Sequence, residues 1–154
     1  MKVKFLNPFV DSACEILSLE LHEKVERGNL QLETDAYVTD DVTVILSLIG
    51  SVEGTVFYSM SKEVTLQLTS KLMDKAFDTL DRLVQSGVAE LGNVITGRAS
   101  MKLADAGYEA DISTPSLIMG KGATISTLDH PRLIVPLITS MGTITIHLAL
   151  RERL

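Results

Sequence analysis

The chain lacks what several classes of protein need. It has no tryptophan and one cysteine, Cys14. Because there is a single cysteine, the chain carries neither a disulfide framework nor a cysteine-based zinc site. Cys14 lies in the apolar stripe of an expected helix, which is more typical of a buried structural thiol than of a nucleophile. Hydrophobic residues make up 45% of the chain, yet no apolar run approaches the roughly 18 residues that span a membrane. Asn7 and Pro8 break the N-terminal segment too early for a signal peptide, so we expect one cytoplasmic domain over residues 1–154.

Basic charge is also scarce. The 14 lysines and arginines are scattered and the net charge is −6, which argues against binding to nucleic acid. The three histidines, His22, His130 and His147, are widely separated and show no ligand spacing, so we expect no metal bound by the chain itself. His147 falls on the outward-facing side of an alternating strand and is expected at the surface.

Turn residues and hydrophobic periodicity divide the chain into helices and strands. Asn7 before Pro8 is typical of a helix start, Gly28 of a helix stop, and Ser61 of an N-cap. Helices are predicted from Pro8 to about Glu26, over residues 62–74, and from Asp78, with Asp81 three residues on, to just before Gly107. Strands are predicted over residues 30–38, 42–49, 54–60, 109–119, 123–127 continuing into 132–139, and 142–150.

A faint internal repeat suggests how these elements assemble. Gly54-Thr55-Val56 and Gly142-Thr143-Ile144 each open the last strand of a hairpin, and each hairpin follows a helix. The chain is thus expected to use a helix-then-strands unit twice, with one extra helix in the second unit. Two such repeats would pair into one antiparallel sheet backed by helices, which is an α+β fold.

The longest predicted helix contains two residues that are unfavourable inside a helix. Gly92 costs about 1 kcal/mol relative to alanine, and the Asn93 amide competes for backbone hydrogen bonds. At about 100° per residue, four positions share one face: Ser86, Glu90, Asn93 and Gly97. An apolar stripe lies opposite: Val84, Val88, Leu91, Ile95 and Ala99. The polar face is either a functional site or only the solvated side of an amphipathic helix.

The segment from Ser86 to Ala99 resembles the signature helix of the CheC/CheX/FliY phosphatases of bacterial chemotaxis. That signature reads Asp/Ser-x-x-x-Glu-x-x-Asn, followed at a distance by proline. Ser86, Glu90 and Asn93 match it, and Pro115 follows at about the expected distance. Two other segments are also similar to the family: Ile49 to Val56, and Met119-Gly120. The resemblance extends over nearly the whole chain.

The resemblance implies a substrate, the phosphorylated receiver domain of a CheY-like response regulator, whose phospho-aspartate is hydrolysed. Asn93 would orient the attacking water, and Glu90 would pair with the active-site lysine of the receiver. Ser86 and Gly97 would line the contact, with Gly97 permitting close approach. Mg²⁺ would be supplied by the response regulator, so no cofactor of the chain's own is expected.

Two other functions remain alternatives. A domain of the same fold could bind a receiver through this helix without hydrolysing anything. A small-molecule enzyme that uses Glu90 as a base is a weaker alternative, because no second titratable group on that face would tune its pKa or act as the matching acid.

The first predicted helix repeats part of the motif. Asp11, Glu15 and Ser18 have the same spacing, with serine in place of asparagine. Two-site members of the family carry the full motif in both halves, so the chain is more similar to the single-site CheX branch. Alternatively, these three residues are only the solvated face of an amphipathic helix.

The apolar character of the chain predicts self-association. Mean hydropathy is +0.24 and only 22% of residues are charged. The strand from Val42 to Ile49 is apolar on both faces, so its second face or an open edge would need a partner. CheX-type members resemble this case and pair strands between subunits, which implies a homodimer with the signature helices free. The alternative is an internal layer that covers these strands within one monomer.

Overall fold

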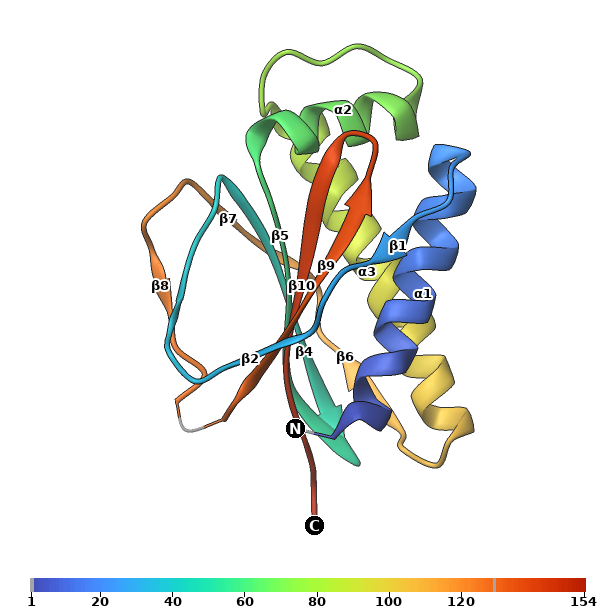
Figure 1. Cartoon of the computed structure of the whole chain (residues 1–154), viewed down its shortest axis with the longest axis vertical. Coiled ribbons are helices and arrows are strands. Elements are labelled where there is room, and N and C mark those ends of the chain that lie inside the picture. The colour runs from blue at the N-terminus through green and yellow to red at the C-terminus, as the bar shows by residue number, and fades with distance from the viewer. Residues whose placement is uncertain (1, 129) are drawn as a thin grey trace.

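The computed structural model describes residues 2–128 and 130–154 (Figure 1). Its helices are α1 (Val3–Leu21), α2 (Lys62–Met73) and α3 (Arg82–Asp105). Its strands are β1 (Glu26–Arg27), β2 (Gln31–Glu33), β3 (Tyr37–Val38), β4 (Val42–Gly50), β5 (Val52–Met60), β6 (Ala110–Ile112), β7 (Ser116–Met119), β8 (Thr124–Ile125), β9 (Arg132–Thr139) and β10 (Gly142–Glu152). Within these described ranges, no helix is both long and apolar enough to cross a membrane.

One large antiparallel sheet forms the centre of the molecule. Its strand order is β1-β9-β10-β5-β4-β6, with β2 also paired to β9 and β7 to β4. The two long hairpins, β4–β5 and β9–β10, meet at the β5–β10 pair, where Ser59 is opposite Thr145 and Gly54 opposite Leu150. Helices α1 and α3 lie on one face of the sheet (Figure 1). The predicted α+β fold, one antiparallel sheet backed by helices, is confirmed.

Helix α3 packs on the sheet through the stripe predicted from the sequence. All five apolar positions of that stripe are buried: Val84, Val88, Leu91, Ile95 and Ala99. A polar contact adds to this packing, because the Tyr58 hydroxyl lies 2.7 Å from the Thr96 hydroxyl oxygen in the interior. A buried hydroxyl pair of this kind satisfies both groups and fixes the register of the helix on the strand.

The ends of the helices differ in part from the predictions. Helix α1 begins at Val3 and includes Pro8, which removes one helical hydrogen bond. Complete burial of Leu6 and Phe9 on either side of this proline outweighs that loss. The helix ends at Leu21, so the expected continuation to Glu26 is wrong. Helix α2 ends within one residue of the prediction.

Helix α3 and several strands also differ from expectation. Asp81, rather than Asp78, is the N-cap of α3, because its carboxylate accepts the Val84 backbone N–H at 2.9 Å. The expected strand over residues 30–38 is two short strands, β2 and β3, and that over 109–119 is β6 and β7. The segment predicted over 123–127 is β8, which pairs with β3 and does not continue into β9.

The second face of the sheet is partly covered by a small layer formed by β3, β8 and their flanking loops (Figure 1). Beneath it lies His147, whose side chain is 4% exposed, so the prediction of a surface histidine is wrong. Arg132 Nε donates to His147 Nδ1 at 3.2 Å, and His147 Nε2 lies 3.1 Å from the Ser59 hydroxyl. Arg132 Nη1 also donates to the Asp35 carbonyl, and the Tyr37 ring lies 4.5 Å from the imidazole.

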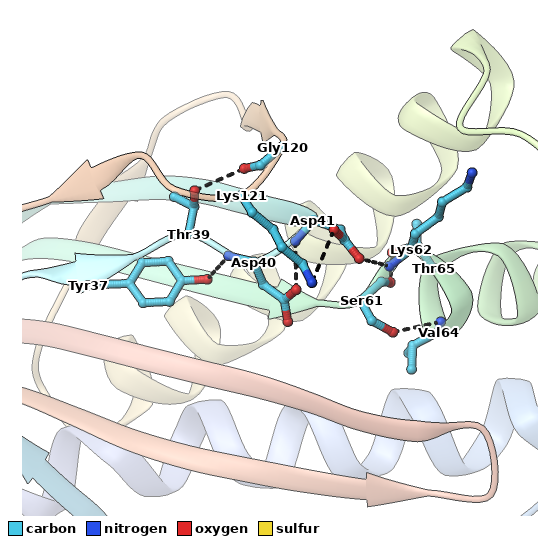
Figure 2. A network of polar contacts seen from close by, with 10 residues as sticks. All are labelled: Tyr37, Thr39, Asp40, Asp41, Ser61, Lys62, Val64, Thr65, Gly120 and Lys121. Carbon is cyan, nitrogen blue, oxygen red and sulfur yellow. Dashed lines mark hydrogen bonds and ion pairs between the residues drawn. The ribbon is translucent and has the colours of Figure 1, made fainter.

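A network of polar contacts ties this layer to the start of α2 (Figure 2). The Asp41 carboxylate accepts the Lys62 backbone N–H at 2.7 Å, and its other oxygen lies 3.9 Å from Lys121 Nζ. The Thr39 hydroxyl donates to the Gly120 carbonyl at 2.9 Å. A carboxylate at a helix N-terminus also complements the helix dipole. The position of α2 is thus fixed by segments distant in the sequence.

Folding stability should depend on the protonation of His147. Burial and the nearby Arg132 lower the pKa of this imidazole to about 4, whereas in the unfolded chain it stays near 6.5. At pH values between these two pKa values, His147 therefore binds a proton in the unfolded chain but not in the folded one. The free energy of unfolding falls as the pH drops through this range. We expect His147 to account for about 2 kcal/mol of stability lost between pH 7 and pH 5.

The measurement is urea unfolding at pH 7 and pH 5 for the wild type and for His147→Gln. The variant should lose less stability than the wild type on acidification. Exposed His130, replaced in the control His130→Gln, should leave the wild-type pH dependence intact. An equal pH dependence in all three proteins would contradict the assignment.

Candidate functional site

The outer face of α3 carries the predicted site residues on the side away from the sheet. Ser86 and Glu90 are exposed, and Asn93 and Gly97 are half-buried. In the part of the chain that the structure describes, neither the Glu90 carboxylate nor the Asn93 carboxamide makes a side-chain hydrogen bond or an ion pair. Both groups are therefore available to a partner from solvent.

Two glycines of α3 have different surroundings. A Cβ atom at Gly92 would lie 2.8 Å from Val44 Cγ1 and 3.4 Å from Tyr58 Cδ2, so this glycine lets the helix approach the sheet. Gly92, which suggested a site in the sequence, is thus explained by packing. A Cβ atom at Gly97 would meet only Ile112 Cδ1, at 3.9 Å. Packing within the described residues therefore does not require a glycine at this position.

The first-half motif on α1 is occupied by contacts within the chain. Glu15 binds Lys102 at 2.7 Å and Arg98 at 3.3 Å, both on α3. The hydrogen bond from Lys102 and the two cationic charges lower the pKa of the Glu15 carboxyl. Ser18 Oγ accepts the Val25 backbone N–H at 3.0 Å. Two of the three residues, Glu15 and Ser18, thus already have partners within the chain.

A groove of about 350 Å³ opens beside Glu90, where α1, α2 and α3 meet. We call it the three-helix groove and define it by six of its lining residues: Ile16, Glu20, Leu72, Met73, Glu90 and Val94. Sequence reasoning did not find this groove, because its walls come from three separate helices. The sequence feature that could have indicated the groove is Val94, an apolar residue one turn after Glu90 on the polar face of the helix. In the structure its side chain is 44% exposed.

The outer face of α3 offers a carboxylate and a carboxamide with complementary abilities. The Glu90 carboxylate can accept hydrogen bonds from an ammonium or guanidinium group. The Asn93 carboxamide can both donate and accept, so it can hold a water molecule in a defined orientation. Over residues 2–128 and 130–154, no group of three or more His, Cys, Asp and Glu side chains is placed to hold a metal ion. Burial raises the pKa of the Cys14 thiol, which makes it a poor nucleophile.

Comparison with known proteins gives a consistent set of relatives. The family model described as "Chemotaxis phosphatase CheX" matches residues 42–137. The CheY-P phosphatase CheX of Thermotoga maritima is 27% identical over 128 residues, which cover 82% of this chain and 83% of that protein. A CheC-like superfamily protein from Shewanella sp. PV-4 superposes with a TM-score of 0.89 at 29% identity, covering 99% of this chain and 100% of that one.

A further similar structure is a CheX-CheY-BeF3-Mg²⁺ complex from Borrelia burgdorferi. It superposes with a TM-score of 0.84 at 31% identity, and the match covers 98% of this chain and 100% of that chain. The similarity therefore extends over almost the full length, and the α1–α3 and hairpin arrangement is shared as a whole.

Substitutions at the two glycines of α3 should have opposite effects on stability. Gly97→Ala should stabilise the protein by up to about 1 kcal/mol, because alanine favours the helix and the space is open. Gly92→Ala should destabilise it by about 1–3 kcal/mol, because the new methyl group overpacks the contact with Val44. Urea unfolding of the two variants provides the comparison, with each serving as the control for the other. A gain of stability in both would show that α3 does not depend on close approach at Gly92.

Proposed function

Because this chain belongs to the family of the chemotaxis phosphatase CheX, we propose that it hydrolyses the phospho-aspartate of a CheY-type response regulator. The observation that carries the proposal is the exposed outer face of α3, where Glu90 and Asn93 occupy the signature positions of the family. Two relatives support it: one is named a CheY-P phosphatase, and the other was solved in a complex with CheY. The proposed location is the cytoplasm, where such a regulator acts.

Asn93 is the proposed water-orienting residue. Transfer of a phosphoryl group needs an in-line nucleophile and charge stabilisation more than a strong base. A neutral carboxamide on a rigid helix meets the first need, because it can hold a water molecule at a fixed angle to the phosphorus. Positioning of this kind contributes several kcal/mol to lowering a barrier. The half-buried position of Asn93 restricts its rotamers and so favours this role.

Glu90 is the proposed docking residue, paired with the active-site lysine of the receiver. Its carboxylate is exposed and lies one helical turn before Asn93 on the same face. An ion pair at this point would set the position of α3 over the receiver's phosphorylation site. Ser86 and Gly97 would extend the contact to either side along the helix. Mg²⁺ would come from the receiver, as a metal bound in its own acidic pocket.

Replacing Asn93 tests the catalytic part of the proposal. Asn93→Ala should lower the rate of phosphate release from a phosphorylated receiver by about 100-fold or more, because the water loses its orienting group. The fold should be intact, since alanine is favoured over asparagine in a helix. The control is Gln67→Ala, which removes an exposed carboxamide from the neighbouring helix α2 and should leave the rate unchanged.

Near wild-type turnover by Asn93→Ala would contradict the water-orienting role. A wild-type protein that binds the receiver but does not accelerate phosphate release would instead be a non-catalytic receiver-binding module.

We also propose that residues 1–154 act as one domain that forms a homodimer through a sheet edge. The β3–β8 layer already covers part of the second sheet face, so an unpaired edge is the more favourable contact. Next to the edge formed by β1 and β2, three apolar side chains are exposed: Leu30 at 37%, Leu32 at 60% and Ile138 at 54%. A symmetric pair joined there would leave both copies of α3 free.

Light scattering at micromolar concentration tests this association. The wild type should have the mass of two chains, and Leu32→Lys should shift it toward one chain, because an edge lysine opposes strand pairing. Val38 is similarly exposed at 62% but belongs to the small β3–β8 sheet, so Val38→Lys is the control and should stay dimeric. A wild-type mass of one chain at all concentrations would exclude the dimer.

A further inference from the structure

The three-helix groove lies directly beside the docking residue of α3. Helix α2 lies across the ends of α1 and α3 (Figure 1), and its last residues, Leu72 and Met73, form one wall. Ile16 of α1 lies at the groove and is almost fully buried, and Val94 of α3 is 44% exposed. An apolar recess of about 350 Å³ is at the small end of the range for binding pockets and suits a single large side chain.

The wall of this groove is adaptable. Gly87 of α3 lies at the groove without a side chain, and a Cβ atom there would run into the Met73 thioether. The missing side chain therefore lets Met73 fold over α3. Methionine has a flexible, polarisable side chain that repacks around different partners. A groove walled by methionine can adjust to an incoming apolar group without moving the helices.

The charge around the groove has one sign. Its lining includes two titratable side chains, Glu20 and Glu90, and both are acidic. Two arginines of α3 lie one turn beyond the ends of this lining: Arg98 is bound to Glu15 of α1, and Arg82 is at the start of the helix. An apolar side chain accompanied by lysine or arginine therefore fits both the recess and its rim, whereas an acidic partner would be repelled.

We propose that the three-helix groove receives an apolar side chain of the docked receiver domain, next to a cationic residue of the same receiver surface. The inference rests on the proposed function and adds the partner chemistry of a second contact. By helix geometry, Val94 lies about 40° to one side of Glu90 and Asn93 about 60° to the other. The groove and the water-orienting residue are thus on opposite sides of the ion pair.

This arrangement solves an orientation problem. A single ion pair between Glu90 and a lysine fixes one point of contact and leaves the receiver free to turn about it. An apolar side chain seated beside Val94 supplies a second fixed point, because buried apolar anchors contribute most of the binding energy of an interface. With two points fixed, Asn93 and its water keep a constant angle to the phosphoryl group. The groove therefore acts on affinity and docking geometry and does not touch the reacting atoms.

The test compares two apolar residues of α3 that are almost equally exposed. Val94 is 44% exposed and contributes to the groove, whereas Leu83 is 45% exposed and is not among its lining residues. The probe is a CheY-type receiver loaded with beryllium fluoride and Mg²⁺, and its dissociation constant is measured by calorimetry. Val94→Gln should weaken binding about tenfold, and Leu83→Gln should weaken it less than twofold. Thermal unfolding should show both variants folded.

Kinetics with the phosphorylated receiver separate this inference from the proposed function. Val94→Gln should raise KM by a similar factor and lower kcat by only a few-fold, because the receiver docks less tightly and less uniformly, whereas Asn93→Ala should lower kcat by about 100-fold without weakening binding of the loaded receiver. Glu20→Gln should reduce the salt dependence of binding. A wild type that binds the loaded receiver without releasing phosphate would overturn the phosphatase proposal alone, because the binding constants still test the groove.

Three results would overturn the groove assignment. The first is a wild-type dissociation constant for Val94→Gln. The second is an equal loss for Leu83→Gln, which would show that the whole outer face of α3 acts without a specific recess. The third is a Val94→Gln variant whose dimer dissociates in light scattering while its affinity for the receiver is unchanged, which would make a second copy of this chain the occupant.

Discussion

Close packing of α3 against the sheet is the constraint on which the rest of the molecule depends. Because Gly92 has no side chain, the helix can lie within contact distance of Val44, and the buried Tyr58–Thr96 hydroxyl pair fixes its register. Because α3 is held in this way through one face, its opposite face lies at a fixed distance from the sheet and at a fixed orientation to it. The backbone positions of the residues on that face are then fixed by the packing of the inner face. This explains how the backbone positions of Glu90 and Asn93 are fixed while, within the described residues, their side chains make no hydrogen bond or ion pair.

The features that could be predicted from the sequence are those set by local periodicity. The limits of α2 and the end of α3 follow from capping residues and glycine, and β10 follows from strict alternation. The arrangement of site residues on one face of α3 needed only the 3.6-residue period, so it could be stated before any tertiary contact was known. Their roles needed the family resemblance, because a carboxylate and an amide on a helix have no unique chemistry.

The features that could not be predicted depend on long-range burial. His147 was assigned to solvent because alternation in an antiparallel strand normally marks one wet face. In this fold the second face is partly covered by β3 and β8, strands of two residues each, which carry no periodic signal. Likewise Pro8 was expected at a helix start, although burial of Leu6 and Phe9 extends the helix past it. The three-helix groove is invisible in the sequence because three distant segments form it.

Helices α1 and α3 carry a similar motif, but the motif carboxylates, Glu15 and Glu90, have different surroundings. On α1, the Glu15 carboxylate pairs with Lys102 and Arg98 of α3 at the exposed edge of the contact between the two helices. On α3, Glu90 has no such cation within the described chain, so its charge is available outside it. A carboxylate at the motif position can therefore serve either the fold or a partner, and neighbouring lysines and arginines decide which. Because Arg98 and Lys102 both lie on α3, the helix that carries Glu90 also supplies the cations that pair with Glu15 on α1.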